Sequence, residues 1–275
     1  MTGIIDAHAH LQSREFDADR AAVLERAWQA GLDAVVNAGD DLASSAAAVA
    51  LAEADPRLFA TVGVHPHAAS SLDGAALHRL ADLARSSPRV VAVGEIGLDF
   101  YRNLSPPDHQ RRAFRAQLDL ADELGLPVVI HARAAAEETY RILAAWAGAR
   151  PRTAPLGVLH CFEGDADLAA RYVALGFLIS VPGTVTYPKN ARTQEVAAVT
   201  PLDALVVETD CPYLTPQSRR GRRNEPGLIT ETVAKIAELR GTAPEEVARH
   251  TARNAARLFR LPRGTAAAAG GREAT

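Results

Sequence analysis

Histidine and acidic side chains stand where several short apolar runs of the sequence end. His8 and His10 follow the first run, and because side chains alternate along a strand, both imidazoles would face one cation. Four further donors stand at the ends of later runs: Glu95, His131, His160 and Asp210. Four imidazoles and two carboxylates suit divalent ions such as Zn²⁺, Mn²⁺ or Mg²⁺. The pattern therefore predicts metal chemistry.

The elements that would position these donors form a repeated strand–helix unit. Helical segments at 19–30, 107–124 and 165–175 are closed by Gly31, Gly125 and Gly176, where a helix C-cap belongs. The expected strands begin at intervals of roughly 21 to 37 residues, as βαβ repeats require. They span residues 4–8, 34–38, 58–64, 90–95, 127–131, 156–160, 177–181 and 204–210. Eight such units predict an α/β fold, a (β/α)₈ TIM barrel, rather than an open sheet.

A single domain is expected over residues 1–262, because no change in composition divides the chain before its end. A further helix is expected over 244–259, after the eighth repeat. Residues 263–275 are rich in alanine and glycine, and we expect a short disordered C-terminal tail without a function of its own.

The expected barrel would bring the six donors together, because the carboxyl ends of all its strands open on one rim. A lone histidine at a strand end is more often structural. Six such groups without a metal would instead leave several buried polar groups unpaired, at about 1–3 kcal/mol each. We therefore predict two divalent ions, with Glu95 as the bridging carboxylate. Asp210 would bind metal and also accept a proton from the attacking water. The full ligand set is His8, His10, Glu95, His131, His160 and Asp210.

Three residues are candidates for contact with a substrate. Arg133 follows His131 by two residues and could hold a phosphate or carboxylate, although a surface arginine is the alternative. His65 is expected to contact either a metal ligand or the substrate, whereas His67 fits a loop position better. Arg222 lies in the one concentrated run of positive charge near the mouth, which fits either a phosphate-binding or a solvated loop. We expect Glu208 to form a structural pair.

Composition limits the classes of function. The formal net charge of −3 gives no overall attraction to nucleic acid or to an anionic membrane, so a nucleic-acid substrate would need a local contact at the barrel mouth. Two cysteines do not form a disulfide framework, and we expect a cytoplasmic protein. No apolar run has the length of a membrane span. The sequence leaves the oligomeric state open, and a monomer is the simplest expectation.

Seven motifs together resemble the TatD family of metal-dependent hydrolases. They are DAHAHL (6–11), GVHPH (63–67), GEIGLDFYR (94–102), VVIHAR (128–133), LHCFEG (159–164), ETDCPYL (208–214) and RRNEP (222–226). The resemblance implies a TIM barrel of the amidohydrolase superfamily and a deoxyribonuclease that removes nucleotides from the 3′ end of DNA. It also implies the same six metal ligands, with His65 and Arg133 on the substrate side.

Two positions depart from the family pattern, with Ala134 in place of an aspartate and Glu163 in place of a serine. The main hypothesis is a divalent-metal-dependent 3′–5′ exodeoxyribonuclease that uses an activated water. Hydrolysis of an amide or ester, such as an aminoacyl-tRNA linkage, is the first alternative. A non-catalytic binding barrel is the second, although this chain keeps every ligand.

Overall fold

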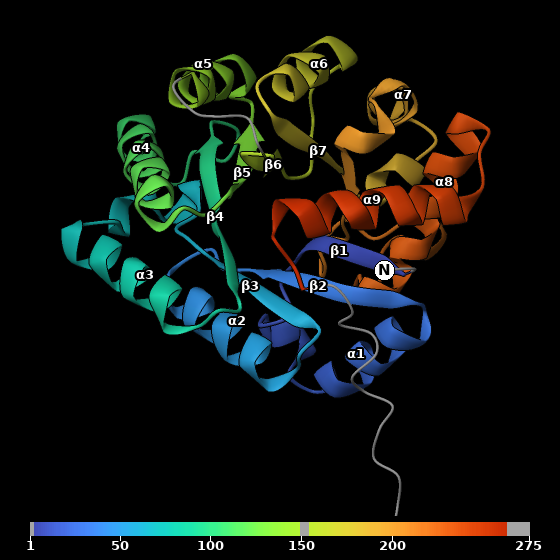
Figure 1. Cartoon of the computed structure of the whole chain (residues 1–275), viewed down its shortest axis with the longest axis horizontal. Helices are drawn as coiled ribbons and strands as arrows, with labels where there is room; N and C mark the ends of the chain where they lie inside the picture. Colours follow the sequence, from blue (N-terminus) through green and yellow to red (C-terminus); the bar gives the residue numbers. More distant parts are fainter. Residues whose placement is uncertain (1–2, 149–153, 263–275) are drawn as a thin grey trace, which may run out of the picture.

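A computed structural model describes residues 3–148 and 154–262, and its sheet contains eight parallel strands in the order β1 to β8. The strands alternate with helices that form an outer ring (Figure 1). The strands are β1 Ile4–Ala9, β2 Leu32–Ala38, β3 Leu58–Val62, β4 Val90–Asp99, β5 Val128–Arg133, β6 Gly157–Leu159, β7 Phe177–Val181 and β8 Leu205–Val207. This arrangement confirms the predicted TIM barrel.

The outer helices pack their apolar faces on the barrel. Helix α4 has the predicted bounds and ends at Gly125, whose φ of 63° is the left-handed conformation that favours glycine at a C-cap. The helices are α1 Arg20–Gln29, α2 Leu42–Ala54, α3 Gly74–Ser86, α4 Pro107–Leu124, α5 Ala136–Ala147, α6 Ala166–Ala174, α7 Ala191–Val199, α8 Ile229–Arg240 and α9 Pro244–Leu258. None of the described helices is long and apolar enough to cross a membrane.

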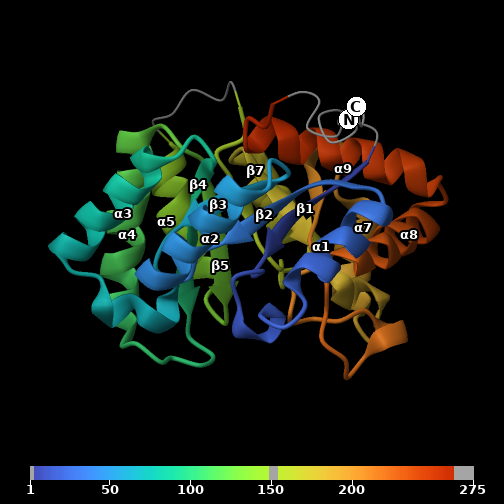
Figure 2. The ribbon, with the colours of Figure 1, turned by 90° about the horizontal axis from the view of Figure 1, so that it is seen from below.

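Helix α9 confirms the expected additional helix and covers one end of the barrel, opposite the loops that follow the strands (Figure 2). Its Ala252, Ala255 and Leu258 join a buried apolar cluster with Ile5 and Phe59 inside the barrel. This cluster separates that end of the barrel from solvent. The predicted tail, residues 263–275, lies outside the described residues.

Two strands contain an irregularity next to expected metal ligands. Between Asp6 and Ala9, β1 has one more residue than β2, whose partners there are Val35 and Asn37. Strand β4 has a similar shift between Val93 and Ile96. Such bulges redirect the following side chains. They let Ile5 face the barrel interior near α9 while His8 and His10 face it at the other end.

Strand boundaries differ most from the prediction at β4 and β8, and by one or two residues at several other strands. Strand β4 continues past Glu95 to Asp99, because Gly97 pairs closely with His131 on β5. A Cβ on Gly97 would lie 1.9 Å from the His131 carbonyl oxygen, so only glycine permits this approach. Strand β8 ends at Val207, and Asp210 therefore lies in the loop beyond it, with φ at 55°.

Strand β1 meets the segment after β8 and brings the first and last parts of the barrel together. The backbone N–H of Asp210 donates to the carbonyl oxygen of His8 at 2.9 Å, and that of His10 donates to Cys211 at 2.8 Å. The Asp6 carboxylate accepts hydrogen bonds from the backbone N–H and the hydroxyl of Thr209. These bonds place three expected ligands side by side.

Candidate metal centre

Four donor atoms face one another at the rim end of the barrel. The Nε2 atoms of His8 and His10 are 3.1 Å apart. Glu95 Oε2 lies 3.4 Å from the first and 3.8 Å from the second. Asp210 Oδ1 lies 3.7 and 3.3 Å from the same two atoms. Ligands about 2.1 Å from a tetrahedral cation are separated by about 3.4 Å. This group therefore fits one divalent cation.

A second group surrounds the other oxygen of Glu95. His131 Nδ1 lies 2.8 Å from Glu95 Oε1, and His160 Nε2 lies 3.7 Å from it. His160 Nε2 is also 3.9 Å from Asp210 Oδ1. Because the two carboxylate oxygens face different imidazoles, Glu95 has the arrangement of a bridging ligand. The structure thus brings together all six residues of the predicted set, while their binding of metal stays a prediction.

Backbone and carboxylate acceptors orient two of the imidazoles. His10 Nδ1 donates to the Ala38 carbonyl oxygen at 3.1 Å, so once the ring is neutral its lone pair is on Nε2, toward the site. His160 Nδ1 lies within ion-pair distance of Glu208 Oε1, at 3.0 Å, and its Nε2 faces the site. The Glu208 carboxylate accepts hydrogen bonds from the Cys161 N–H and the Ser180 hydroxyl. Carboxylates that hold a ligating histidine in this way are common in metal sites.

His65 has the opposite tautomer. Its Nδ1 accepts a hydrogen bond from the backbone N–H of His67 at 3.1 Å, so the proton of the neutral ring sits on Nε2. Burial is the main reason that the pKa of His65 is lowered to about 3, so the ring is neutral at ordinary pH. Nε2 lies 3.5 Å from Glu95 Oε1, within reach of the cluster, but it is a donor there and not a ligand. This favours the substrate-side interpretation of His65.

Asp99 is a buried residue of the site whose contacts the sequence interpretation missed. Its Oδ2 lies 3.3 Å from His131 Nε2 and 2.8 Å from His67 Nε2. Its Oδ1 accepts backbone N–H groups of Tyr101 and Arg102. Asp99 therefore orients the His131 ring through Nε2, the nitrogen that does not face Glu95. The spacing of four residues between Glu95 and Asp99 on one strand is the signal that would have placed both on one face.

The charges of the cluster favour cations. Burial opposes protonation of His10, but its hydrogen bond to Asp210 and the charge of Glu95 raise its pKa to about 9. Burial likewise opposes protonation of His160, whose pKa is raised to about 10 by Glu208, Glu95 and Asp210. The protein alone therefore holds protons where a divalent cation would bind. Metal binding must displace these protons, as it does in other histidine sites.

Asp6 is a second buried carboxyl group that the sequence interpretation did not include. Burial raises its pKa to about 7, although Thr209 and His8 donate hydrogen bonds that favour the ionised form. The same carboxylate contacts His8 in β1 and Thr209, the neighbour of Asp210. Asp6 thus fixes the relative position of ligands on the two strands.

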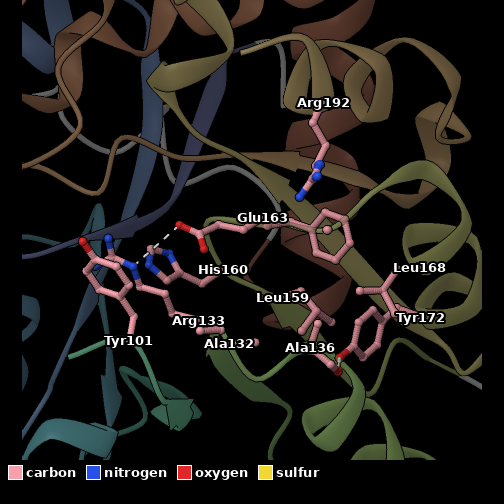
Figure 3. A pocket seen from close by; sticks show the side chains of 13 residues that line it. Tyr101, Ala132, Arg133, Ala136, Leu159, His160, Glu163, Leu168, Tyr172 and Arg192 are labelled. Atoms are coloured by element: carbon pink, nitrogen blue, oxygen red, sulfur yellow. Dashed lines mark hydrogen bonds and ion pairs between the residues drawn. The ribbon is translucent and has the colours of Figure 1, made fainter. Parts of the chain in front are cut away.

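Arg133 lies beside the metal centre. Its guanidinium carbon is 4.1 Å from the centre of the Tyr101 ring, and its Nε is 3.9 Å from Glu163 Oε1 (Figure 3). Arg222 is exposed, and its side chain has no contact with the cluster among the residues described. The neighbouring Arg223 forms an ion pair with Asp19, so part of the arginine run is structural.

Comparisons with known proteins agree with this geometry. A family model described as TatD related DNase matches residues 5–260. A metal-dependent hydrolase of Bacillus subtilis, YabD, is 38% identical over 94% of this chain and 99% of its own length. The 3′-5′ ssDNA/RNA exonuclease TatD of Erwinia billingiae is 40% identical over 94% of this chain and all of its own. The crystal structure of a TatD homologue from Escherichia coli, YJJV, has a TM-score of 0.87 at 34% identity, covering 94% of this chain and 98% of that one.

Proposed function

This chain belongs to the family of TatD-related DNases, and on that premise we propose that it removes nucleotides from the 3′ end of single-stranded DNA with the help of two divalent metal ions. The observation that supports this proposal best is the pair of donor groups that share Glu95, with Arg133 beside them. The Erwinia relative is a 3′-5′ ssDNA/RNA exonuclease, and the proposed polarity and strand type follow that activity.

The residues present fit two cations. His8, His10, Glu95 and Asp210 would hold one ion, and Glu95, His131 and His160 would hold the other. Mg²⁺, Mn²⁺ and Zn²⁺ are the candidates, given this donor set. Bound there, they would supply Lewis-acid activation of water and would offset the charge on the phosphoryl oxygens.

The protein side chains have separate tasks in this proposal. Burial opposes ionisation of Asp210, but His10 and the other imidazoles lower its pKa, so its carboxylate is ionised and can accept a proton from the attacking water. The Nε2–H of His65 and the Arg133 guanidinium donate hydrogen bonds to phosphoryl oxygens. Arg222 lies in a loop at the rim and contacts the DNA strand at a point away from the scissile bond.

A 5′-labelled single-stranded oligonucleotide, incubated with Mg²⁺ or Mn²⁺, tests the proposal. We expect stepwise shortening from the 3′ end, which stops when the metal is chelated and resumes when it is restored. Asp210→Asn should reduce the rate by about 10²–10⁴-fold, the usual contribution of a positioned acid or base. Asp82→Asn, an exposed aspartate on α3, is the matched control.

Parallel assays with aminoacyl-tRNA and simple amides test the first alternative, because the same donors could serve those reactions. Cleavage of an amide or ester without cleavage of DNA would replace the proposed substrate. Equal rates for Asp210→Asn and the parent protein would contradict the role given to Asp210.

A further inference from the structure

A pocket of about 390 Å³ opens directly beside His160, one of the expected metal ligands (Figure 3). It lies between the segment after β5, the segment after β6 and the first turn of α7. Pockets that bind small ligands have volumes of about 300–1,000 Å³, so this one has room for a single nucleotide and not for a longer segment of strand. Anything that enters it would adjoin the metal centre.

The pocket has an apolar interior and a charged mouth. Leu159, Phe162 and Leu168 line the interior, with Tyr172 behind them. Arg133, Glu163 and Arg192 surround the mouth, and Figure 3 shows Arg192 extending toward it from α7. An apolar wall that includes an aromatic ring suits the face of a nucleobase, and arginines suit the adjoining phosphate.

Glu163 is an unused acceptor at this mouth. Its side chain is 54% exposed, and the 3.9 Å between its Oε1 and Arg133 Nε is too long for a hydrogen bond. Within residues 3–148 and 154–262, no group donates a hydrogen bond to its carboxylate. A nucleotide whose 5′-phosphate contacts Arg133 would therefore have a free carboxylate within reach of its sugar. Ala134, the other position that departs from the family pattern, lines the same pocket.

We propose that this pocket holds the terminal nucleotide of the strand, with its base against the apolar wall and its 3′-hydroxyl group donating a hydrogen bond to Glu163. The proposal rests on the proposed exonuclease function and deepens it. A strand that continued beyond this nucleotide would carry a phosphate at the same place. The carboxylate would repel that phosphate, so Glu163 selects a free 3′ end and makes the enzyme remove one nucleotide at a time.

Three oligonucleotides that share one 5′ label and one sequence test the role of Glu163. They end in a 3′-hydroxyl, a 3′-hydrogen or a 3′-phosphate. A hydrogen bond to a charged group raises binding affinity roughly tenfold or more. The oligonucleotide with a 3′-hydroxyl should therefore be cleaved at least about ten times faster than the one with a 3′-hydrogen, and the one with a 3′-phosphate should be cleaved most slowly. Glu163→Ala should cleave the 3′-hydroxyl and 3′-hydrogen oligonucleotides at similar rates. Glu163→Gln should relieve most of the discrimination against the 3′-phosphate.

Glu53→Gln is the matched control, since it removes the same charge from an exposed position on α2 and should leave all three rates unchanged. A second readout does not depend on cleavage. Calorimetry should show thymidine 5′-monophosphate binding the parent at least about tenfold more tightly than thymidine 3′,5′-bisphosphate, with this ratio lost in Glu163→Ala.

The outcomes separate the two proposals. If none of the oligonucleotides is cleaved while the calorimetric ratio is present, the exonuclease function is wrong and the nucleotide pocket is retained. Similar rates on all three ends, or a Glu163→Ala protein that discriminates as the parent does, would overturn the role of Glu163 while the exonuclease function stands.

Discussion

The two ends of the barrel are built from the same strands yet differ in almost every physical respect. At the α9 end, the interior is filled by alanine, valine and phenylalanine side chains, and solvent is excluded. At the rim end, His8, His10 and His160 are buried together with several carboxyl groups, and His131 is half-buried beside them. The bulge between Asp6 and Ala9 marks the border in β1, with Ile5 on one side and His8 on the other.

This difference indicates that one end of the barrel mainly stabilises the fold and the other end mainly forms the candidate site. Apolar burial at the α9 end stabilises the barrel by about 25 cal/mol per Å² of surface removed from water. The rim end concentrates charge that is favourable only when carboxylates are matched by protons or cations. A change at one end should therefore leave the property of the other end intact.

The largest expected effect is at the α9 end. Phe259→Ala removes a buried ring from the apolar cluster and should lower the free energy of unfolding by about 3–5 kcal/mol, measured by chemical denaturation. Val199→Ala, at a side chain that is 60% exposed, should cost less than about 0.5 kcal/mol. Metal affinity of the folded Phe259→Ala protein should equal that of the parent. A parallel loss of metal affinity would show that the two ends are coupled.

The next largest effect is the pH dependence of metal binding at the rim. The pKa values of about 9 for His10 and about 10 for His160 mean that both rings are protonated at pH 6–8 before metal binds. Each ion displaces the proton of one of these rings, and one released proton weakens affinity about tenfold per pH unit of acidification, so the affinity for each ion should fall about a hundredfold from pH 8 to pH 6. Calorimetry in buffers of different ionisation enthalpy measures the released protons directly.

The same shifts act with the opposite sign on the metal-free protein. Raised histidine pKa values stabilise the fold fully below the unfolded value of 6.5, and this contribution is lost as pH rises through 9 and 10. Metal affinity that did not change with pH would contradict the protonation state proposed for the two imidazoles.

The smallest effect tests how much the residues behind the ligands contribute. Glu208→Gln keeps the shape of the side chain but removes the charge 3.0 Å from His160 Nδ1. Metal affinity should fall by about 10–100-fold, as it does when such partners are removed elsewhere. Glu195→Gln on the outer helix α7 serves as the comparison. If both variants bind metal equally, Glu208 has no part in orienting His160.

Much of the fold followed from local patterns in the sequence. The apolar runs and the glycines that end helices predicted the eight units, and the family resemblance is confirmed by the family model and by close relatives. Donor residues near the carboxyl ends of strands were predicted to converge, because topology alone brings those ends to one rim. The structure places Glu95, His131 and the others within a few ångströms of one another.

What the sequence did not reveal depends on side chains from distant strands. Simple alternation would place Ile5 and His8 on opposite sides of β1, and only the observed bulge turns both inward. Glu208 and His160, which contact each other, are 48 positions apart in the sequence. Asp6 and Thr209 are 203 positions apart. No local pattern encodes such pairs. The assignment of individual residues to metal and substrate stays a prediction.

The junction between β1 and the segment after β8 also has a consequence for biosynthesis. A ribosome makes His8 and His10 among the first residues of the chain and makes their partner Asp210 only near its end. All eight strands precede Asp210 in the chain, so the expected donor set is completed only after the last strand has been made. With Asp210 as the proposed last ligand, a polypeptide that ended before the segment after β8 should have no hydrolytic activity.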